Sequence, residues 1–266
     1  MLINGRIIDK KMRLIAVDIG NSLINIGYFT DKELFVQKIE THPVKTPGEY
    51  FSIFRDFLSE NSVEKSPLGV IISSVVSGYS EVIREAIKGI ITGDPLILSH
   101  EMKTGLTFDI SRLEELGTDR IANAVAAYEL YKCPVAAVDC GTAITISVVG
   151  KNANYIGGAI MPGIGLMNES LANGTSKLSE VPLSSPGSAL GTDTTQCIQS
   201  GLFYGTAGAV ERLLYEIEKE CGFELKVIIT GGYGEMISKF LRRGHSVRQH
   251  LTLEGLKIIY MRNKDA

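Results

Sequence analysis

One short pattern occurs twice in the sequence, and this internal repeat limits the folds that the chain can adopt. Residues 14–22 read Leu-Ile-Ala-Val-Asp-Ile-Gly-Asn-Ser, and residues 135–143 read Val-Ala-Ala-Val-Asp-Cys-Gly-Thr-Ala. In each copy an apolar run ends in Asp-x-Gly and a small polar residue, after which apolar and polar residues alternate. The pattern predicts a strand, a tight turn and a second strand, present twice.

Turns of this kind suit the binding of phosphate. Glycine leaves room for backbone amides to approach an anion. Asp18 and Asp139 stand at the strand ends, where a carboxylate can hold a cation or a water molecule beside that anion. An aspartate before a glycine is also a common turn former, so each copy alone fits either role. Two copies in matching contexts favour a phosphate-transfer site, with the turns facing each other across a cleft.

The length and the order of the elements indicate two domains. The 266 residues lie between one large domain and two ordinary ones, and the repeat favours two similar halves. Predicted strands and helices are interleaved, which is typical of an α/β architecture. An alanine-rich helix with Thr118 or Asp119 as its expected N-cap ends before Pro134, where the second repeat begins. We therefore predict domains at 13–132 and 133–266.

Charge and cysteine content argue against several classes of partner. The formal net charge is −3 with acids and bases interspersed, so we expect no nucleic-acid partner. No segment approaches the roughly 18 uninterrupted apolar residues of a membrane span, and residues 1–12 lack the apolar core of a signal peptide. The four cysteines are far apart, which favours free thiols over a disulfide framework or zinc site. We expect a cytoplasmic protein with no membrane partner.

A group of polar residues stands just before the second repeat. It is Gly117-Thr118-Asp119-Arg120, at the start of the alanine-rich helix. Asp119 as a helix cap and Arg120 as a surface cation would be an ordinary pair of roles. The position of the group instead favours a helix start that points its amides and Asp119 into the cleft. A carboxylate there can accept or orient the proton of a substrate hydroxyl, and Arg120 offers a planar donor fork to a carboxylate or phosphate.

Together with a third glycine turn, Thr230-Gly-Gly232, the two repeats resemble the phosphate and adenosine loops of the actin, sugar-kinase and acetate-kinase superfamily. The resemblance implies an α/β fold of two duplicated ribonuclease-H-like domains. Each domain would hold a mixed five-stranded sheet flanked by helices, with an ATP cleft between the two domains.

A longer series of motifs, spanning residues 13–262, resembles type III pantothenate kinases. In chain order the motifs are Asp18-Ile-Gly-Asn-Ser22, Ser73-Ser-Val-Val76, Gly117-Thr-Asp-Arg120 with Asn123-Ala-Val-Ala-Ala127, Val138-Asp-Cys-Gly-Thr-Ala143, Gly157-Gly-Ala-Ile-Met-Pro-Gly163, Gly191-Thr-Asp-Thr194, Gln199-Ser-Gly201, Thr230-Gly-Gly232 and Leu251-Thr-Leu-Glu-Gly255. The resemblance implies ATP-dependent phosphorylation of the terminal hydroxyl of pantothenate to 4′-phosphopantothenate, the first step toward coenzyme A.

The resemblance also implies a pantothenate site. Asp119 matches the proton acceptor of the family, which makes it the expected catalytic residue. Thr194 matches a substrate contact that the neighbouring subunit provides, so a homodimer with a shared active site is implied. The substrate-binding residues that match are Gly117, Thr118, Asp119, Arg120 and Thr194. In the loop before Gly117, Phe108 or Ile110 stands where the family offers a tyrosine to pantothenate.

Nucleotide and cation sites follow from the same resemblance. Asp139 matches the aspartate that binds a monovalent cation, potassium or ammonium. The ATP-binding residues that match are Asp18, Ile19, Gly20, Asn21, Ser22, Leu23, Ile24, Asn25 and Thr142. We expect ATP to bind with magnesium, which usually prefers phosphate oxygens and few protein ligands.

Two alternatives stay open at this point. One is a catalytically silent relative with a regulatory or accessory role, and the other is a different small-molecule kinase or a polyphosphate phosphatase of the superfamily. The presence of Asp18, Asp119, Arg120 and Asp139 favours an active enzyme, because a silent protein is free to lose such costly buried charges. The loop at Gly117 and the presence of Thr194 favour pantothenate over other acceptors.

Overall fold

A computed structural model describes residues 13–61, 68–91 and 93–264. The prediction that residues 1–12 do not form a signal peptide therefore concerns residues outside the described ranges. The chain divides into two compact units, one within Met1–Met102 and Leu256–Ala266 and the other within Lys103–Gly255. Of the helices in the described ranges, none has the length and apolar character that crossing a membrane requires.

The first unit contains a mixed five-stranded sheet in the order β3-β2-β1-β4-β5. Its strands are β1 (Leu14–Ile19), β2 (Leu23–Phe29), β3 (Leu34–Glu40), β4 (Gly69–Ser74) and β5 (Leu96–Ile97). The central strand β1 pairs antiparallel with β2 and parallel with β4. All six residues of β1 are buried, as expected for a strand covered on both faces. The predicted mixed five-stranded sheet is confirmed in this unit.

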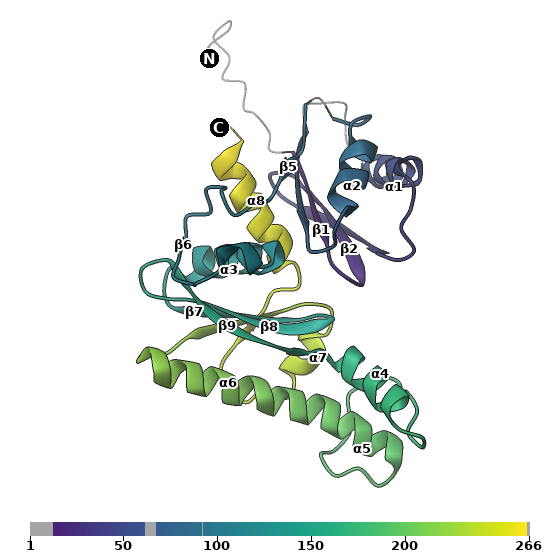
Figure 1. The fold of residues 1–266 in the computed structure, drawn as a ribbon, viewed down its shortest axis with the longest axis vertical. Helices are drawn as coiled ribbons and strands as arrows, with labels where there is room; N and C mark the ends of the chain where they lie inside the picture. The colour runs from purple at the N-terminus through teal and green to yellow at the C-terminus, as the bar shows by residue number, and fades with distance from the viewer. Residues whose placement is uncertain (1–12, 62–67, 92, 265–266) are drawn as a thin grey trace, which may run out of the picture. The chain divides into compact units, whose positions relative to one another are not determined.

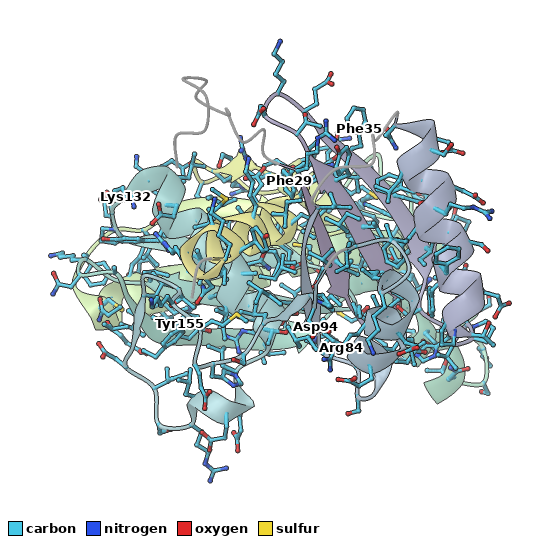
Figure 2. The ribbon with its side chains drawn as sticks, turned by 90° about the horizontal axis from the view of Figure 1, so that it is seen from above. Phe29, Phe35, Arg84, Asp94, Lys132 and Tyr155 are labelled. Atoms are coloured by element: carbon cyan, nitrogen blue, oxygen red, sulfur yellow. The ribbon has the colours of Figure 1, made fainter. Side chains whose placement is uncertain are left out.

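Helices α1 (Pro47–Glu60) and α2 (Tyr79–Ile87) cover one face of this sheet (Figure 1). Thr46 and Glu49 form a capping box that fixes the start of α1. Arg84 of α2 pairs with Asp94 at 3.2 Å and so ties the loop before β5 to the helix (Figure 2). The result is a closed apolar core between the helices and the sheet.

The C-terminal helix α8 (Leu251–Asn263) ends in the first unit. A Cβ atom on Gly69 would collide with the ring of Tyr260, so glycine lets this ring lie directly against β4. The ammonium of Lys257 lies 5.0 Å from the ring centroid of Phe29, and Phe29 is labelled in Figure 2. These contacts attach the end of the chain to the first sheet.

The second unit contains a six-stranded sheet in the order β11-β10-β7-β8-β9-β6. Its strands are β6 (Thr107–Phe108), β7 (Val135–Cys140), β8 (Ala143–Val149), β9 (Asn154–Pro162), β10 (Lys226–Thr230) and β11 (Ser246–Val247). β7 pairs antiparallel with β8 and parallel with β10, as β1 does with β2 and β4. The order β9-β8-β7-β10-β11 thus repeats the order of the first sheet, which confirms the duplication predicted from the repeat.

The sixth strand corrects the prediction of five strands in each domain. β6 lies in a polar segment without an alternating pattern, yet it adds to the sheet edge at β9. The Thr107 N–H donates to Ala153 O at 2.9 Å, and the Asp109 N–H donates to Tyr155 O at 2.8 Å. The two residues of β6 pair with β9 through backbone groups alone. The pattern of side chains in the sequence therefore did not indicate this strand.

Helices cover both faces of the second sheet. They are η1 (Leu113–Glu115, a 3-10 turn), α3 (Thr118–Tyr131), α4 (Ile164–Gly174), α5 (Thr194–Ser200), η2 (Gly201–Gly205, a π-helical turn), α6 (Thr206–Cys221) and α7 (Gly234–Ser238). α3 lies on one face and α6 on the other (Figure 1). The predicted α/β class with helix-flanked mixed sheets is confirmed.

The observed division differs from the predicted domains at 13–132 and 133–266. α3 precedes that boundary in sequence, but Arg120 and Asn123 bind side chains of the second sheet. The last turns of α8 follow the boundary but belong to the first unit. The repeat marks where the second central strand begins, and it carries no information about which neighbouring helix packs on which sheet.

Candidate active site

The first Asp-x-Gly turn joins β1 to β2 in the first unit. Asp18 is 8% exposed at the end of β1, and Asn25 Nδ2 donates to Asp18 Oδ2 at 3.4 Å. The Gly20 N–H donates to Leu23 O at 3.0 Å and closes the turn. A Cβ atom on Gly20 would lie only 3.1 Å from that carbonyl oxygen, so glycine keeps the turn tight. Asn21 and its neighbour Ser22 are exposed at the tip.

Thr41, which the sequence analysis missed, holds this turn from the end of β3. Its Oγ1 donates to Gly20 O at 2.8 Å and its N–H donates to Ser22 O at 3.0 Å. Its own carbonyl oxygen accepts a hydrogen bond from Tyr79 OH at 3.0 Å. In a trans peptide the carbonyl and the following N–H point in opposite directions. The bond from Thr41 to Gly20 therefore turns the Asn21 N–H away from Thr41.

The second Asp-x-Gly turn joins β7 to β8 in the second unit and is held in a similar way. The Gly141 N–H donates to Ala143 O at 3.1 Å, and the Gly163 N–H donates to Thr142 O at 3.0 Å from the end of β9. A Cβ atom on Gly163 would collide with the carbonyl oxygen of Gly141. In both units the end of the third strand of the repeat therefore fixes the turn.

The two carboxylate oxygens of Asp139 have different surroundings. Asn123 Nδ2 donates to Asp139 Oδ2 at 2.9 Å. Oδ1 lies beside two glycine turns: a Cβ atom on Gly141 would be 3.5 Å from it, and one on Gly231 would collide with it. Gly231 has φ +91°, a conformation that also favours glycine. Oδ1 therefore faces glycine backbone, where a cation or a water molecule could bind.

The charges of the site make Asp139 unusual. Burial and the nearby carboxylate of Asp119 raise the pKa of Asp139 to about 6, although the hydrogen bond from Asn123 lowers it. Burial also raises the pKa of Asp119, although the Arg120 N–H and the charge of Arg120 oppose this shift. Burial and the charge of Asp139 raise the pKa of Cys140 to about 12, so this thiol stays protonated. Two carboxylates that disfavour each other's charge invite a cation.

The start of α3 differs from the expected cap. Gly117 is the N-cap, and neither Thr118 nor Asp119 takes that position. Asp119 Oδ1 instead accepts from the Arg120 N–H at 2.8 Å. Asp119 is therefore a residue of the first helical turn, where the free backbone amides of the helix stabilise a negative charge. The predicted N-cap is one or two residues too late, because a polar side chain was expected at that position. Gly117 serves as the N-cap without a side chain.

The guanidinium of Arg120 is fixed against β8 and β9. Arg120 Nε donates to Ser147 Oγ at 3.2 Å, and Nη2 donates to Ile146 O at 3.2 Å. The guanidinium carbon lies 5.9 Å from the ring centroid of Tyr155, which is labelled in Figure 2. A Cβ atom on Gly158 would lie 3.2 Å from Nη2. A guanidinium has five N–H donors, so Arg120 keeps donors for a substrate anion while its orientation is set.

Sequence reasoning also missed the residues that orient Arg120. Ser147 and Tyr155 lie in alternating strand patterns where such residues are common, and Gly158 is one of many glycines. Tyr155 OH donates to Ser147 Oγ at 3.4 Å, and the Phe108 ring packs on Tyr155 with centroids 5.9 Å apart. Phe108 therefore packs on the tyrosine that lies beside the guanidinium of Arg120. It belongs to β6, the strand that was not predicted from the sequence.

The predicted residues fall into two sets. Asp119, Arg120 and Asp139 lie together in the second unit, which also holds Thr142 in the β7–β8 turn. Thr194 is the exposed first residue of α5, after the N-cap Asp193. The predicted ATP-binding residues 18–25 all lie in the first unit, at the end of β1, in its turn and in β2.

The duplicated sheets place the chain in a known class. A solved structure of the activator of 2-hydroxyisocaproyl-CoA dehydratase from Clostridium difficile with bound ADPNP aligns with a TM-score of 0.55 over 96% of this chain and 97% of that chain, at 10% identity. A conserved putative Baf family transcriptional activator from Campylobacter jejuni aligns with a TM-score of 0.58 over 95% and 100%, at 22% identity. These likenesses show the fold, which this chain shares with both proteins.

The family within this class follows from the sequence. The family model for type III pantothenate kinase matches residues 14–216. The type III pantothenate kinase of Finegoldia magna is 38% identical over 257 residues, which cover 95% of this chain and 98% of that protein. The chain therefore belongs to the type III pantothenate kinase family, and the predicted family is confirmed. Membership makes it a kinase that uses ATP, and such enzymes typically act with a divalent metal.

The donor groups can be tested against the expected metals. Among the described residues, no group of three or more histidine, cysteine, aspartate or glutamate side chains could hold a metal ion. Asp139 Oδ1, with glycine backbone beside it, fits a monovalent cation that takes oxygen ligands.

Proposed function

We propose that this chain transfers the terminal phosphoryl group of ATP to the terminal hydroxyl of pantothenate and so forms 4′-phosphopantothenate for coenzyme A biosynthesis. The observation that carries the proposal is the first turn of α3, where Asp119 lies close enough to Asp139 to act on its charge and Arg120 is fixed against Ser147. The name of the relative from Finegoldia magna supports pantothenate as the acceptor.

Asp119 is the proposed catalytic residue. Its carboxylate is half-buried and its pKa is raised by burial, so it is a better proton acceptor than an exposed aspartate. Phosphoryl transfer generally passes through a loose transition state, in which positioning matters more than early deprotonation. We infer that Asp119 first orients the pantothenate hydroxyl and then takes its proton as the bond to phosphorus forms.

Arg120 is the proposed anchor for pantothenate. A planar guanidinium binds a carboxylate with two parallel hydrogen bonds, and pantothenate carries one carboxylate. The contacts with Ser147 Oγ and Ile146 O at 3.2 Å fix the plane of the guanidinium before the substrate arrives. Gly117 and Thr118 supply the neighbouring backbone of the same loop. An anchor fixed in advance loses less conformational entropy on binding.

The two Asp-x-Gly turns are the proposed contacts for ATP. Asp18, Ile19, Gly20, Asn21, Ser22, Leu23, Ile24, Asn25 and Thr142 are the residues concerned. Thr41 supports this proposal, since it directs the Asn21 N–H away from the body of the turn, as a phosphate contact requires. Asp18 would share a magnesium ion with the phosphates through water or directly.

Asp139 is the proposed ligand of a monovalent cation, potassium or ammonium. A bound cation would neutralise part of the charge on the transferring phosphoryl group. The position of Oδ1 beside Gly141 and Gly231 and the raised pKa of Asp139 support this proposal, because a cation there would stabilise the charged carboxylate.

Thr194 is proposed to contact the pantothenate bound to a second copy of the chain, in a homodimer with a shared site. Its exposed position at the start of α5 supports this role. We place the enzyme in the cytoplasm, since all four cysteines are free thiols, as a reducing compartment favours.

An acceptor panel tests the proposed function. The purified protein is mixed with magnesium, ATP and either pantothenate or other small hydroxyl compounds, in potassium or in sodium buffer. We expect phosphate transfer to pantothenate, and only with potassium. Turnover of a different acceptor would indicate another small-molecule kinase. No turnover with any acceptor would contradict the proposal and favour the regulatory alternative.

A further inference from the structure

A chain of hydrogen bonds reaches Asp139 from the C-terminal helix. Thr252 Oγ1 in the first turn of α8 donates to Asn123 Oδ1 at 2.9 Å, and Asn123 Nδ2 donates to Asp139 Oδ2 at 2.9 Å. Asn123 is only 1% exposed in α3. Residues from α8, α3 and β7 are thus linked in one line, all within the second unit. The motif at 251–255 has no role in the proposed reaction described above, and this contact links it to Asp139 through Asn123.

The order of donors fixes the amide of Asn123. A carboxylate accepts hydrogen bonds only, so the amide NH₂ must face Asp139. The amide oxygen then faces Thr252, whose hydroxyl can donate to it. Rotating the amide by half a turn would set its oxygen against the carboxylate. Thr252 therefore stabilises the one orientation that holds Asp139.

The approach of α8 to α3 depends on a glycine. A Cβ atom on Gly255 would collide with the carbonyl oxygen of Ala122, which precedes Asn123 in the chain. The two helices are therefore in backbone contact one turn after Thr252. This contact brings a short threonine side chain within reach of the asparagine.

We propose that Asn123 and Thr252 are positioning residues that prepare Asp139 for a monovalent cation. The inference rests on the proposed cation site. By holding Oδ2, Asn123 stops rotation of the carboxylate and leaves Oδ1 beside Gly141 and Gly231, where the cation binds. Groups that orient a metal ligand typically change metal affinity by about 10–100-fold when they are removed. Neither residue touches the reacting atoms.

Cation-dependent melting tests this role without turnover. The full-length protein is melted with magnesium and ADP while potassium chloride replaces tetramethylammonium chloride at constant ionic strength. We expect potassium to raise the melting temperature of the parent protein with a saturating dependence. Thr252→Val keeps the shape of the side chain but loses the hydroxyl, so the half-saturating potassium concentration should rise about 10-fold. Thr252→Ser should restore most of the affinity.

A matched control is available in the same unit. Thr206 is a buried threonine, 2% exposed, whose hydroxyl has no partner among the described residues. Thr206→Val makes the same chemical change without breaking a hydrogen bond. It should leave the half-saturating potassium concentration unchanged.

Non-additivity tests whether Thr252 acts through Asn123. Asn123→Ala should weaken potassium binding more than Thr252→Val, because it removes the bond to Asp139 itself. The double variant should bind potassium as Asn123→Ala does, since residues in one network do not act independently. Additive losses would contradict the chain of contacts. Melting in tetramethylammonium alone checks that each variant is folded.

Two results would overturn the inference. One is an unchanged potassium dependence in Thr252→Val, and the other is a parent protein that shows no potassium-dependent shift. Transfer of phosphate to pantothenate by the parent protein is measured separately. If the parent is active while Thr252→Val binds potassium normally, only this inference fails. If potassium binding weakens as expected but no pantothenate is phosphorylated, the proposed function fails and the positioning role stands.

Discussion

Arg120 and Asp139 each use some of their hydrogen-bonding atoms for contacts within the protein, and their other polar atoms are left for ligands. Arg120 is held by Ser147 and the Ile146 carbonyl oxygen, and Asp139 is held by Asn123. A side chain fixed in this way is oriented before a ligand arrives, so less of the binding free energy goes into ordering it. At the scale of single residues, the site is therefore a set of charged groups with prepared orientations.

Ser147→Ala tests the orientation of Arg120. The variant leaves the buried Nε of Arg120 without its side-chain acceptor and frees the guanidinium to rotate. A hydrogen bond to a charged group contributes about 1.5–3 kcal/mol, so KM for pantothenate should rise roughly 10-fold or more. KM for ATP should stay within a factor of about two. Steady-state kinetics with each substrate varied in turn would separate the two, and a shared rise in both would argue against a pantothenate-specific role.

At the same scale, residue type limited what the sequence could predict. Asp139 was found because it stands in the repeated pattern, and Asp119 and Arg120 were found because they stand together at a helix start just before it. Thr41, Ser147 and Asn123 were not assigned roles, since a threonine, a serine and an asparagine at such places are ordinary. Their importance comes from what they contact across the sheet, which no local pattern records.

At the scale of elements, the third strand of each repeat fixes the turn before it. Thr41 follows β3 and Gly163 follows β9, and each donates a backbone hydrogen bond to the carbonyl of the turn. Thr41→Val removes the hydroxyl that holds Gly20 O at 2.8 Å but keeps the shape. We expect KM for ATP to rise about 5–10-fold, by the usual worth of one hydrogen bond, while KM for pantothenate is unchanged. Unchanged KM for ATP would show that this turn does not contact the nucleotide.

The ion pair between Glu218 of α6 and Arg243 gives a pH-dependent contribution to stability. Burial alone would raise the pKa of Glu218, but the hydrogen bonds from Arg243 and from the Leu225 N–H lower it below its ordinary value of 4.5. The stabilisation is therefore present above pH 4.5 and lost as the pH falls through the lowered pKa. Glu218→Gln should cost about 1 kcal/mol near neutral pH and much less in acid. Urea unfolding across this pH range measures the difference, and a cost that did not shrink in acid would refute the ionic origin.

The elements that the sequence did not predict correctly depend on contacts between segments that are far apart in the chain. The first two strands of each repeat could be predicted because each has an apolar run or an alternating pattern. β6 could not, because its two residues join the sheet through backbone groups. The place of α3 with the second sheet depends on contacts such as Asn123 to Asp139, which periodicity cannot reveal.

At the scale of the whole molecule, the proposed homodimer can be tested by mixing two inactive variants. Asp119→Asn removes the proposed catalytic residue, and Thr194→Val removes the proposed contact with the second copy. In a heterodimer of the two, one site combines an intact Asp119 with an intact Thr194. Random exchange of equal amounts should recover about a quarter of the parent activity, because half of the dimers are mixed and each has one intact site. No recovery after subunit exchange would mean that each chain completes its own site.

The central claim is that Asp119 serves the transfer of phosphate from ATP to pantothenate, and one measurement tests it most directly. Mass spectrometry follows the formation of 4′-phosphopantothenate by the parent protein and by Asp119→Asn, with magnesium and potassium present. Asparagine can still accept the hydrogen bond from the Arg120 N–H, so the start of α3 is preserved. We predict steady product formation by the parent and a rate about 10²–10⁴-fold lower for the variant. A parent that makes no product, or a variant as fast as the parent, would contradict the account.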